Sequence, residues 1–392
     1  MDNDYKPKVV FTFVKAGMGH VTPATEIYEA FMKKYGDKCN VCKSYIFSES
    51  TNPAVQKLGV IQDEHVKKLS TSKVYNKLEG FSYCLGSPLT LFGLDFFYRK
   101  GRKPFYKDLQ EINPDLLVST YYLPSHLARQ SNEKGFTNTL IATFSPDPYI
   151  YPAWDRKCDL FFVNNEGAYN QALKKGFDKE KLVQVPFVIR SHIKDTKLNC
   201  DKQQVKKEFD LCVDKPTVLF SFGAYGTNKT DLYVKALLEK DFPINVVAIC
   251  GKNKQTYSNL EDYQNKEYKN TNFKLIGYTE QMDKYLLCAD LIVGKGGSNS
   301  IIEALYMQTP MIVCAQANRL EELTSAYWEK KGVLIRQSNP EKMCQIIEKA
   351  IYQKDFLEQY VNNIKKLNVL DNGSEVCADY LYKMLSKRFK NL

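Results

Sequence analysis

Short apolar strands alternate with helix-like stretches along most of this 392-residue chain, and that alternation constrains the fold more than any other feature. Residues 123–134 and 167–175 are examples of the helical stretches. Such alternation predicts an α/β fold in which parallel sheets are covered by helices on both faces. The predicted strands are residues 9–14, 116–119, 139–144, 160–163, 182–185, 217–222, 245–250, 273–276, 290–293, 311–313 and 333–335.

The length of the chain predicts two domains, because 392 residues exceed what one ordinary core holds. The stretch 190–215 is polar and rich in Lys and Asp, which is typical of a connection between domains. We therefore expect two Rossmann-like domains, at 1–195 and 216–370, joined by a linker at 196–215. Residues 371–392 are expected to form a terminal helix that packs back on the first domain.

The segment that follows the predicted strand 290–293 has the pattern of a phosphate site. Gly296 and Gly297 allow a tight turn and a close approach to a ligand, and Ser298 is expected to cap the helix that begins there. The N–H groups and dipole at a helix N-terminus attract phosphate. Glu303 lies about one and a half turns further on, where it can accept hydrogen bonds from a ribose. An ordinary strand-to-helix turn is the alternative.

Two further glycine turns follow predicted strands. Gly17 and Gly19 come before a helix for which Thr22 is the expected N-cap, and Gly223 follows the strand 217–222. Ligands of parallel sheets bind at the carboxyl ends of the strands. We therefore expect the glycine turns of two facing domains to converge on one central cleft.

Composition favours a cytoplasmic protein. The chain is 44% hydrophobic and 26% charged, contains eleven cysteines without framework spacing, and shows neither an apolar signal core nor an uninterrupted spanning run. Cys39 and Cys42 form a C-x-x-C pair, but no second pair completes a zinc site. We expect no metal ligands and no cofactor.

Positive charge is concentrated in residues 65–107, where nine Lys and Arg residues accompany two carboxylates. Within this segment, residues 81–98 are apolar and aromatic, and Gly86, Pro88 and Gly93 argue against a spanning helix. A basic, aromatic segment of this kind suits the surface of an anionic membrane. A buried segment with a solvated basic rim is the alternative. Nucleic acid is not an expected partner, since no nucleic-acid-binding motif is present.

Three motifs carry a resemblance to a known family. They are GMGHVTPA at 17–24, IGYTEQMDKYLLCADLIV at 276–293 and GGSNSIIEAL at 296–305. In this order they resemble the two-domain glycosyltransferases of the GT-B fold. The most similar branch contains the peptidoglycan lipid-intermediate N-acetylglucosaminyltransferase and the diacylglycerol glycosyltransferases, including monogalactosyldiacylglycerol synthase and the processive diacylglycerol glucosyltransferase. The resemblance extends from residue 9 to about residue 385.

The resemblance implies a UDP-sugar donor bound by the second domain. Tyr278 would stack on the uracil, Glu303 would bind the ribose and the glycine turns would hold the phosphates. Only Glu321 is kept from the family element that binds the donor sugar, so the identity of the hexose stays open. The implied donor-binding residues are Gly223, Tyr278, Gly296, Gly297, Ser298, Glu303 and Glu321.

The acceptor and the catalytic base are expected in the first domain. The resemblance places Gly17 and Gly19 at the acceptor, and a base must take the proton of the acceptor hydroxyl. The candidates are His20, in the glycine loop, and Asp147, in the FSPDPY segment, although Asp147 also suits an ordinary turn. His126 is either structural or acceptor-facing.

Together these expectations describe a peripheral enzyme on the inner face of the membrane that transfers a hexose with inversion to a lipid. Diacylglycerol is the first candidate acceptor and a polyprenyl-linked lipid the second. Two alternatives remain, a UDP-sugar epimerase of the same fold and a non-catalytic nucleotide or lipid binder. The sugar, processivity and oligomeric state are left open.

Overall fold

The computed structural model describes residues 5–14, 18–72, 87–223, 229–353, 355–367 and 369–389, and it divides the chain into two compact units. Unit 1 comprises Met1–Arg190, Asn318–Leu320 and Leu370–Leu392. Unit 2 comprises Ser191–Ala317 and Glu321–Val369.

Unit 1 contains a six-stranded parallel sheet with the order β2-β1-β3-β4-β5-β6. All five strands predicted for this half are confirmed. The sixth strand, β2, was missed because its sequence NVCKS is polar and lies on the exposed edge of the sheet. The strands are β1 (Lys8–Thr12), β2 (Asn40–Ser44), β3 (Leu116–Ser119), β4 (Leu140–Ser145), β5 (Leu160–Val163) and β6 (Leu182–Gln184).

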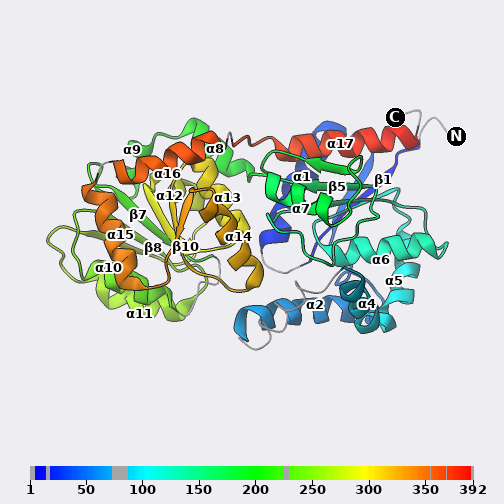
Figure 1. The fold of residues 1–392 in the computed structure, drawn as a ribbon, viewed down its shortest axis with the longest axis horizontal. Helices are drawn as coiled ribbons and strands as arrows, with labels where there is room; N and C mark the ends of the chain where they lie inside the picture. Colours follow the sequence, from blue (N-terminus) through cyan, green and yellow to red (C-terminus); the bar gives the residue numbers. More distant parts are fainter. Residues whose placement is uncertain are drawn as a thin grey trace. The chain divides into compact units, whose positions relative to one another are not determined.

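Alternate residues of the unit 1 strands point to opposite faces of the sheet and belong to two separate hydrophobic cores. Helices therefore cover both faces of this sheet (Figure 1). Val10 packs in one core, against α2, α5, α6 and α7, whereas Val9 and Phe11 pack in the other, against α1 and α17. The helices of this unit are α1 (Met18–Tyr35), α2 (Pro53–Thr71), α4 (Ser87–Phe97), α5 (Arg99–Ile112), α6 (Tyr122–Glu133), α7 (Glu166–Lys174) and α17 (Gly373–Arg388).

The terminal helix α17 packs along α1. Tyr35 and Tyr382 stack with their ring centroids 4.0 Å apart, and Lys34 Nζ lies 2.5 Å from Asp379 Oδ1. At the start of α17, a Cβ on Gly373 would lie 2.1 Å from the carbonyl oxygen of Pro186, so only glycine allows this close approach. Residues 370–389 thus complete the core of unit 1.

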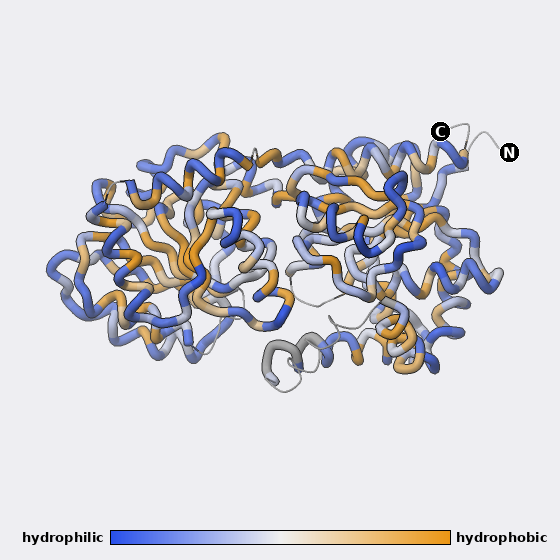
Figure 2. The backbone as a smooth tube through the Cα atoms, viewed as in Figure 1, coloured by the Kyte–Doolittle hydropathy of each residue, from blue (hydrophilic) through white to orange (hydrophobic). Residues whose placement is uncertain are grey.

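Unit 2 contains the second six-stranded parallel sheet, with the order β12-β11-β10-β7-β8-β9, and all six of its strands were predicted. The strands form the apolar interior of the unit in Figure 2. They are β7 (Thr217–Ser221), β8 (Asn245–Ile249), β9 (Asn272–Ile276), β10 (Leu291–Lys295), β11 (Met311–Ala315) and β12 (Leu334–Arg336).

The helices of unit 2 group around this sheet. Helix α10 contacts α11 and α15, and α12 contacts α8, α9 and α13. Their bounds are α8 (Ser191–Asn199), α9 (Lys202–Glu208), α10 (Thr230–Leu238), α11 (Lys254–Gln264), α12 (Met282–Cys288), α13 (Ser298–Met307), α14 (Arg319–Lys330), α15 (Pro340–Tyr352) and α16 (Asp355–Lys366).

Three local expectations differ from the structure. The segment expected as a linker holds the last four residues of α8 and all of α9, and Lys202 Nζ lies 2.7 Å from Asp290 Oδ1. The helix expected to begin after Thr22 already includes Met18, with Pro23 inside it. Helix α13 is capped by Gly297 without a side-chain hydrogen bond, because Ser298 is its first helical residue and not its N-cap.

Candidate active site

His20 is the third residue of α1, in its first turn, at the carboxyl edge of the unit 1 sheet. Its Nδ1 is 2.6 Å from the carbonyl oxygen of Thr120, and the Thr120 hydroxyl donates a hydrogen bond of 2.7 Å to the carbonyl of His20. Thr120 directly follows β3, the neighbour of β1. A carbonyl oxygen can only accept, so Nδ1 carries the proton and Nε2 keeps its lone pair.

The surroundings of His20 keep its imidazole neutral. Burial lowers the pKa of His20 to about 4, although the hydrogen bond to Thr120 raises it in part. The ring of Tyr121 packs edge-on, with a centroid distance of 5.0 Å and an interplanar angle of 82°. A neutral histidine with an available Nε2 can accept a proton at physiological pH.

Asp147 follows β4, on the other side of β3 from β1, and its residue is only 8% exposed. Its loop is held by neighbouring amides. Gln171 Nε2 donates to the carbonyl of Pro148 at 3.2 Å, and Asn164 Nδ2 donates to the carbonyl of Pro146 at 3.3 Å. His20 and Asp147 therefore lie at the carboxyl ends of nearby strands in one sheet.

The glycines expected beside His20 are partly described. A Cβ on Gly19 would meet no atom within 4 Å, so this position borders open space. Gly17 lies outside the described residues.

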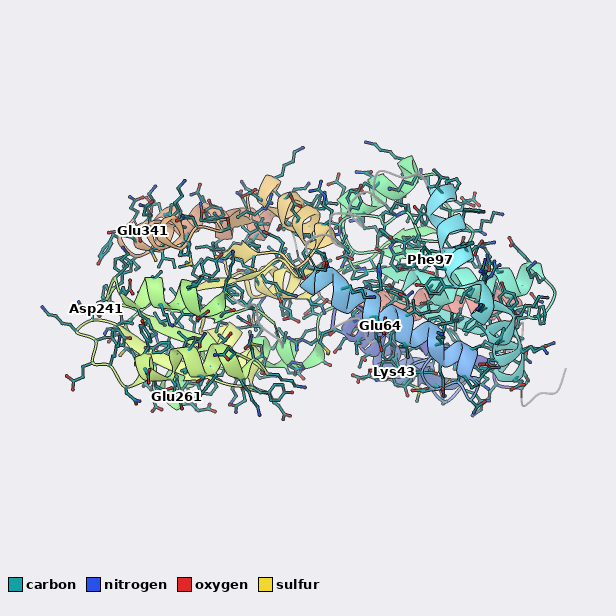
Figure 3. The ribbon with its side chains drawn as sticks, turned by 90° about the horizontal axis from the view of Figure 1, so that it is seen from below. Lys43, Glu64, Phe97, Asp241, Glu261 and Glu341 are labelled. Carbon is teal, nitrogen blue, oxygen red and sulfur yellow. The ribbon has the colours of Figure 1, made fainter. Side chains whose placement is uncertain are left out.

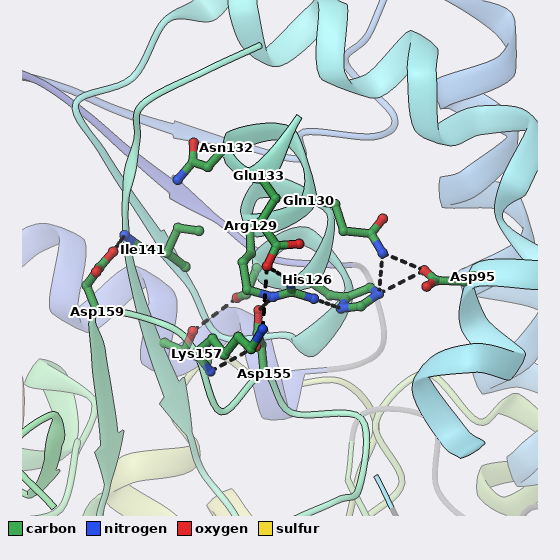
Figure 4. A network of polar contacts seen from close by, with 12 residues as sticks. Asp95, His126, Arg129, Gln130, Asn132, Glu133, Ile141, Asp155, Lys157 and Asp159 are labelled. Carbon is green, nitrogen blue, oxygen red and sulfur yellow. Dashed lines mark hydrogen bonds and ion pairs between the residues drawn. The ribbon is translucent and has the colours of Figure 1, made fainter. Parts of the chain in front are cut away.

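His126 belongs to a buried polar network between α6 and α4 (Figure 4). Its Nε2 lies 2.9 Å from Asp95 Oδ1, to which Gln130 Nε2 also donates at 2.8 Å. Arg129 lies 3.3 Å from His126 Nδ1 and pairs with Asp155, in the segment after Asp147. Both ring nitrogens of His126 therefore have partners in the fold.

The charge of Asp95 is stabilised by the same network. Partial burial raises the pKa of Asp95, but hydrogen bonds from His126 and Gln130, together with the charge of Arg102, hold it below its ordinary value. Arg102 Nη1 lies 3.4 Å from Asp95 Oδ1. The network thus ties α4 to α5 and α6.

Helix α4 exposes large apolar side chains. Phe92 is 73% exposed and Phe97 75% exposed, and Leu89 and Phe96 are also exposed. Figure 2 shows the apolar character of this helix, and Figure 3 labels Phe97 on it. Arg99, at the start of α5, lies over the Phe96 ring at 4.6 Å. Residues 73–86 of the basic, aromatic segment lie outside the described part of the chain.

In unit 2, two glycine turns and one tyrosine lie at the carboxyl edge of the sheet. Gly223 follows β7 with φ of +79°, a conformation that favours glycine. Tyr278 follows β9 and is 60% exposed, with Lys252 Nζ 5.3 Å from its ring centroid. The turn at Gly296 and Gly297 follows β10.

The β10 turn directs the N-terminus of the ten-residue helix α13 toward this edge. A Cβ on Gly296 would lie 3.1 Å from the carbonyl oxygen of Glu321, so glycine lets α14 approach the turn. Ser298 is the first residue of α13, and Glu303 is buried further along it, at 7% exposure. The helix start presents N–H groups and a positive dipole end to an anion.

Lys295 was not among the residues predicted for the site, and it lies beside both glycine turns. Its Nζ is 2.9 Å from Glu321 Oε1, and the N–H of Ala317 donates to Glu321 Oε2 at 2.6 Å. A Cβ built on Gly223 or on Gly297 would lie 3.7 Å from Lys295 Cε. Its position directly before Gly296 and Gly297 is the sequence feature from which its place in the site could have been predicted.

Among the described residues, no group of three or more His, Cys, Asp or Glu side chains is placed to hold a metal ion. Within the same described ranges, no helix has the length and apolarity needed to cross a membrane.

Family models match most of the chain in two parts. Residues 20–187 match the model of monogalactosyldiacylglycerol (MGDG) synthase. Residues 221–359 match the glycosyltransferase family 28 C-terminal domain.

Curated relatives match over nearly the full length. The chain is 25% identical to the processive diacylglycerol beta-glucosyltransferase of Bacillus licheniformis, over 92% of this chain and 90% of that protein. It is 24% identical to the enzyme of the same name from Bacillus subtilis, over 96% and 95%.

Solved structures share the fold. MurG of Acinetobacter baumannii aligns with a TM-score of 0.63 and 14% identity, over 96% of this chain and 99% of that one. The MnaA–UDP complex of S. aureus aligns with a TM-score of 0.60 and 11% identity, over 98% of each chain.

Proposed function

Because this chain belongs to the GT-B glycosyltransferases, in the branch that contains the diacylglycerol glycosyltransferases and the peptidoglycan lipid-intermediate N-acetylglucosaminyltransferase, we propose that it transfers a hexose from a UDP-sugar to diacylglycerol. The observation that carries the proposal is His20, a neutral base with one fixed tautomer at the carboxyl edge of the unit 1 sheet. The near full-length similarity to diacylglycerol glucosyltransferases supports diacylglycerol as the acceptor.

The proposed reaction is a single displacement. His20 Nε2 accepts the proton of the acceptor hydroxyl as its oxygen bonds to the anomeric carbon. The bond from that carbon to the diphosphate oxygen breaks on the opposite face, and its electron pair leaves with UDP. The anomeric configuration is therefore inverted. Asp147 is proposed as a second polar group at the reacting centre, because its held loop follows a strand close to β1.

The proposed donor site follows the carboxyl edge of the unit 2 sheet. The first N–H groups of α13, with Ser298 and the turns at Gly223, Gly296 and Gly297, bind the diphosphate. Tyr278 stacks on the uracil, Glu303 accepts from the ribose and Glu321 from the sugar. We propose that this set acts without a metal ion, since helix dipoles and N–H groups can stabilise a leaving diphosphate.

The proposed membrane contact is α4 with the basic start of α5. The exposed Leu89, Phe92, Phe96 and Phe97 would enter the lipid boundary, each contributing in proportion to the apolar area it buries. Basic side chains near an anionic surface add about 1 kcal/mol each. Exposed ones at this position are Arg99, Lys100, Lys103 and Lys107. This supports a peripheral enzyme on the inner face of the membrane.

The test is transfer of label to lipid. Purified protein is incubated with radiolabelled UDP-glucose or UDP-galactose and vesicles of diacylglycerol with anionic lipid, with and without EDTA. We expect organic-phase label from one donor, unchanged by EDTA. Label that appears only with a polyprenyl acceptor would replace diacylglycerol. Conversion of the UDP-sugar without any acceptor would indicate an epimerase, and UDP binding without turnover would indicate a binder.

A further inference from the structure

Lys295 and Glu321 form a partly buried ion pair at the β10 turn. Their side chains are 28% and 14% exposed, and the contact joins the last residue of β10 to the first turn of α14. The second oxygen of Glu321 accepts the Ala317 N–H, so this carboxylate is held on both sides. These two contacts fix the position of the Glu321 carboxylate.

The lysine stem runs between the two glycine turns of unit 2. A Cβ built on Gly223 or on Gly297 would lie 3.7 Å from Lys295 Cε, at ordinary van der Waals distance, so the lysine stem lies next to both turns. Helix α13 begins at Ser298, three residues after Lys295. The ammonium group thus belongs to the same small region as the N–H groups proposed to bind the diphosphate.

The charge balance of this region changes when an anion enters. An ammonium group has three N–H donors, so it can bond to a phosphate oxygen in place of Glu321 or in addition to it. As the glycosidic bond to phosphate breaks, negative charge on the diphosphate increases, and a fixed cation then interacts with it most strongly. A lysine in contact with the diphosphate would therefore stabilise the transition state more than the bound donor.

We propose that Lys295 is a catalytic residue that binds the diphosphate, and that Glu321 acts as a latch that holds the lysine ammonium group when no donor is bound. Donor binding draws the ammonium group toward the phosphates, which frees one Glu321 oxygen to accept a hydrogen bond from a sugar hydroxyl. Glu321 is placed for this, because its Oε1 would be 3.8 Å from a Cβ on Gly297. The inference rests on the proposed function, since it requires a nucleoside-diphosphate donor.

A purely structural role is the competing explanation. The pair could serve only to fasten α14 to the β10 turn, as other ion pairs fasten other elements. In that case, removal of the charge would lower the melting temperature and weaken the binding of every ligand alike. A diphosphate contact instead affects ligands with phosphates and leaves uridine alone. Calorimetry with UDP and with uridine separates the two roles.

The experiment compares Lys295→Met, Lys295→Arg and Glu321→Gln with the unaltered full-length protein. For Lys295→Met we expect UDP affinity to fall by about ten- to a hundredfold, the range of a lost charge-assisted hydrogen bond, with uridine affinity unchanged. Lys295→Arg should restore most of the UDP affinity. Glu321→Gln should bind UDP at least as tightly, because the competing carboxylate is gone, but transfer the sugar more slowly.

The matched control is Lys284→Met. Lys284 is also a partly exposed lysine of unit 2, at 27%, and its Nζ lies 2.7 Å from Glu208 Oε1 on α9. We expect this variant to bind UDP normally. Equal losses for UDP and uridine in Lys295→Met, or no loss for UDP, would overturn the proposal while leaving the proposed function intact. Absence of UDP binding by the unaltered protein would instead contradict both. Weaker UDP binding by Glu321→Gln would overturn the latch even if Lys295→Met failed to fold.

Discussion

At the scale of single residues, the chemistry depends on protonation, and His20 provides a pH test. Because burial lowers its pKa to about 4, the neutral base persists as the pH falls below 6.5, where an ordinary histidine becomes protonated. We expect kcat/KM to stay level down to about pH 5 and to be lost as the pH falls through about 4. A profile that breaks near 6.5 would remove His20 as the base.

Replacement of His20 gives the corresponding mutational test. We expect His20→Gln to reduce sugar transfer by about 10²- to 10⁴-fold, the usual contribution of a general base, with UDP affinity unchanged. The measurement is single-turnover transfer alongside calorimetry. Near-normal transfer would show that another group takes the proton.

Asp147 is tested separately, because neighbouring amides hold its loop in place. Asp147→Asn keeps the size of the side chain and removes its charge, so we expect lost turnover with donor binding intact. Circular dichroism checks that the loop held by Gln171 still folds. Turnover close to that of the unaltered protein would take Asp147 out of the reacting centre.

Glu303 is the residue whose role is most specific to the nucleotide. Its carboxylate, buried on α13, is proposed to accept hydrogen bonds from the ribose. We expect Glu303→Ala to weaken UDP binding by about ten- to a hundredfold, since hydrogen bonds to charged groups contribute about 1.5–3 kcal/mol. Calorimetry measures the change, and an unchanged affinity would refute the ribose assignment.

At the scale of elements, α4 is the test of membrane contact. We expect Phe92→Ser with Phe97→Ser to reduce binding to anionic vesicles by about a hundredfold or more, because each phenyl ring buried in lipid contributes about 2 kcal/mol and the two together about 4 kcal/mol. Transfer to a short-chain, water-soluble diacylglycerol should be unaffected. Tyr352→Ser is the control, since Tyr352 is similarly exposed on α15.

Vesicle co-sedimentation measures this binding. Equal binding by the double variant and the unaltered protein would show that α4 is not the contact. The loss of vesicle affinity in the double variant is then compared at low and at high salt. An equal loss at both salt concentrations would assign the attraction to apolar burial rather than to Arg99 and its basic neighbours.

At the scale of the whole molecule, the strand pattern was predictable because buried parallel strands are continuous apolar runs. Strand β2 was not predicted, because an edge strand does not require a continuous apolar run and its NVCKS sequence is largely polar. Helices α8 and α9 were not predicted, because their sequences are rich in charged residues. The ion pairs of these residues, such as that of Lys202 with Asp290, are visible only in the folded structure.

The residues of the candidate site were predictable where the residue type and its place after a strand indicate a role. They were less predictable where the role depends on contacts in the folded structure. Glycine turns after strands, followed by a carboxylate on a helix, indicate a nucleotide-diphosphate site. Lys295, in contrast, has the sequence context of any lysine at a strand end, and only its contact with Glu321 in the structure distinguishes it. Likewise, the neutral state of His20 depends on burial and on a carbonyl one hundred residues away in the chain.

The most direct test of the central claim is a spectrum of the glycolipid formed from ¹³C-labelled UDP-glucose or UDP-galactose and diacylglycerol. NMR of the labelled sugar reports the acceptor oxygen and the anomeric configuration together. We predict a β-linked hexose on the free hydroxyl of diacylglycerol, the result of one displacement on an α-linked donor. An α-linked product, or label that remains in the nucleotide sugar or appears as free hexose, would contradict the account.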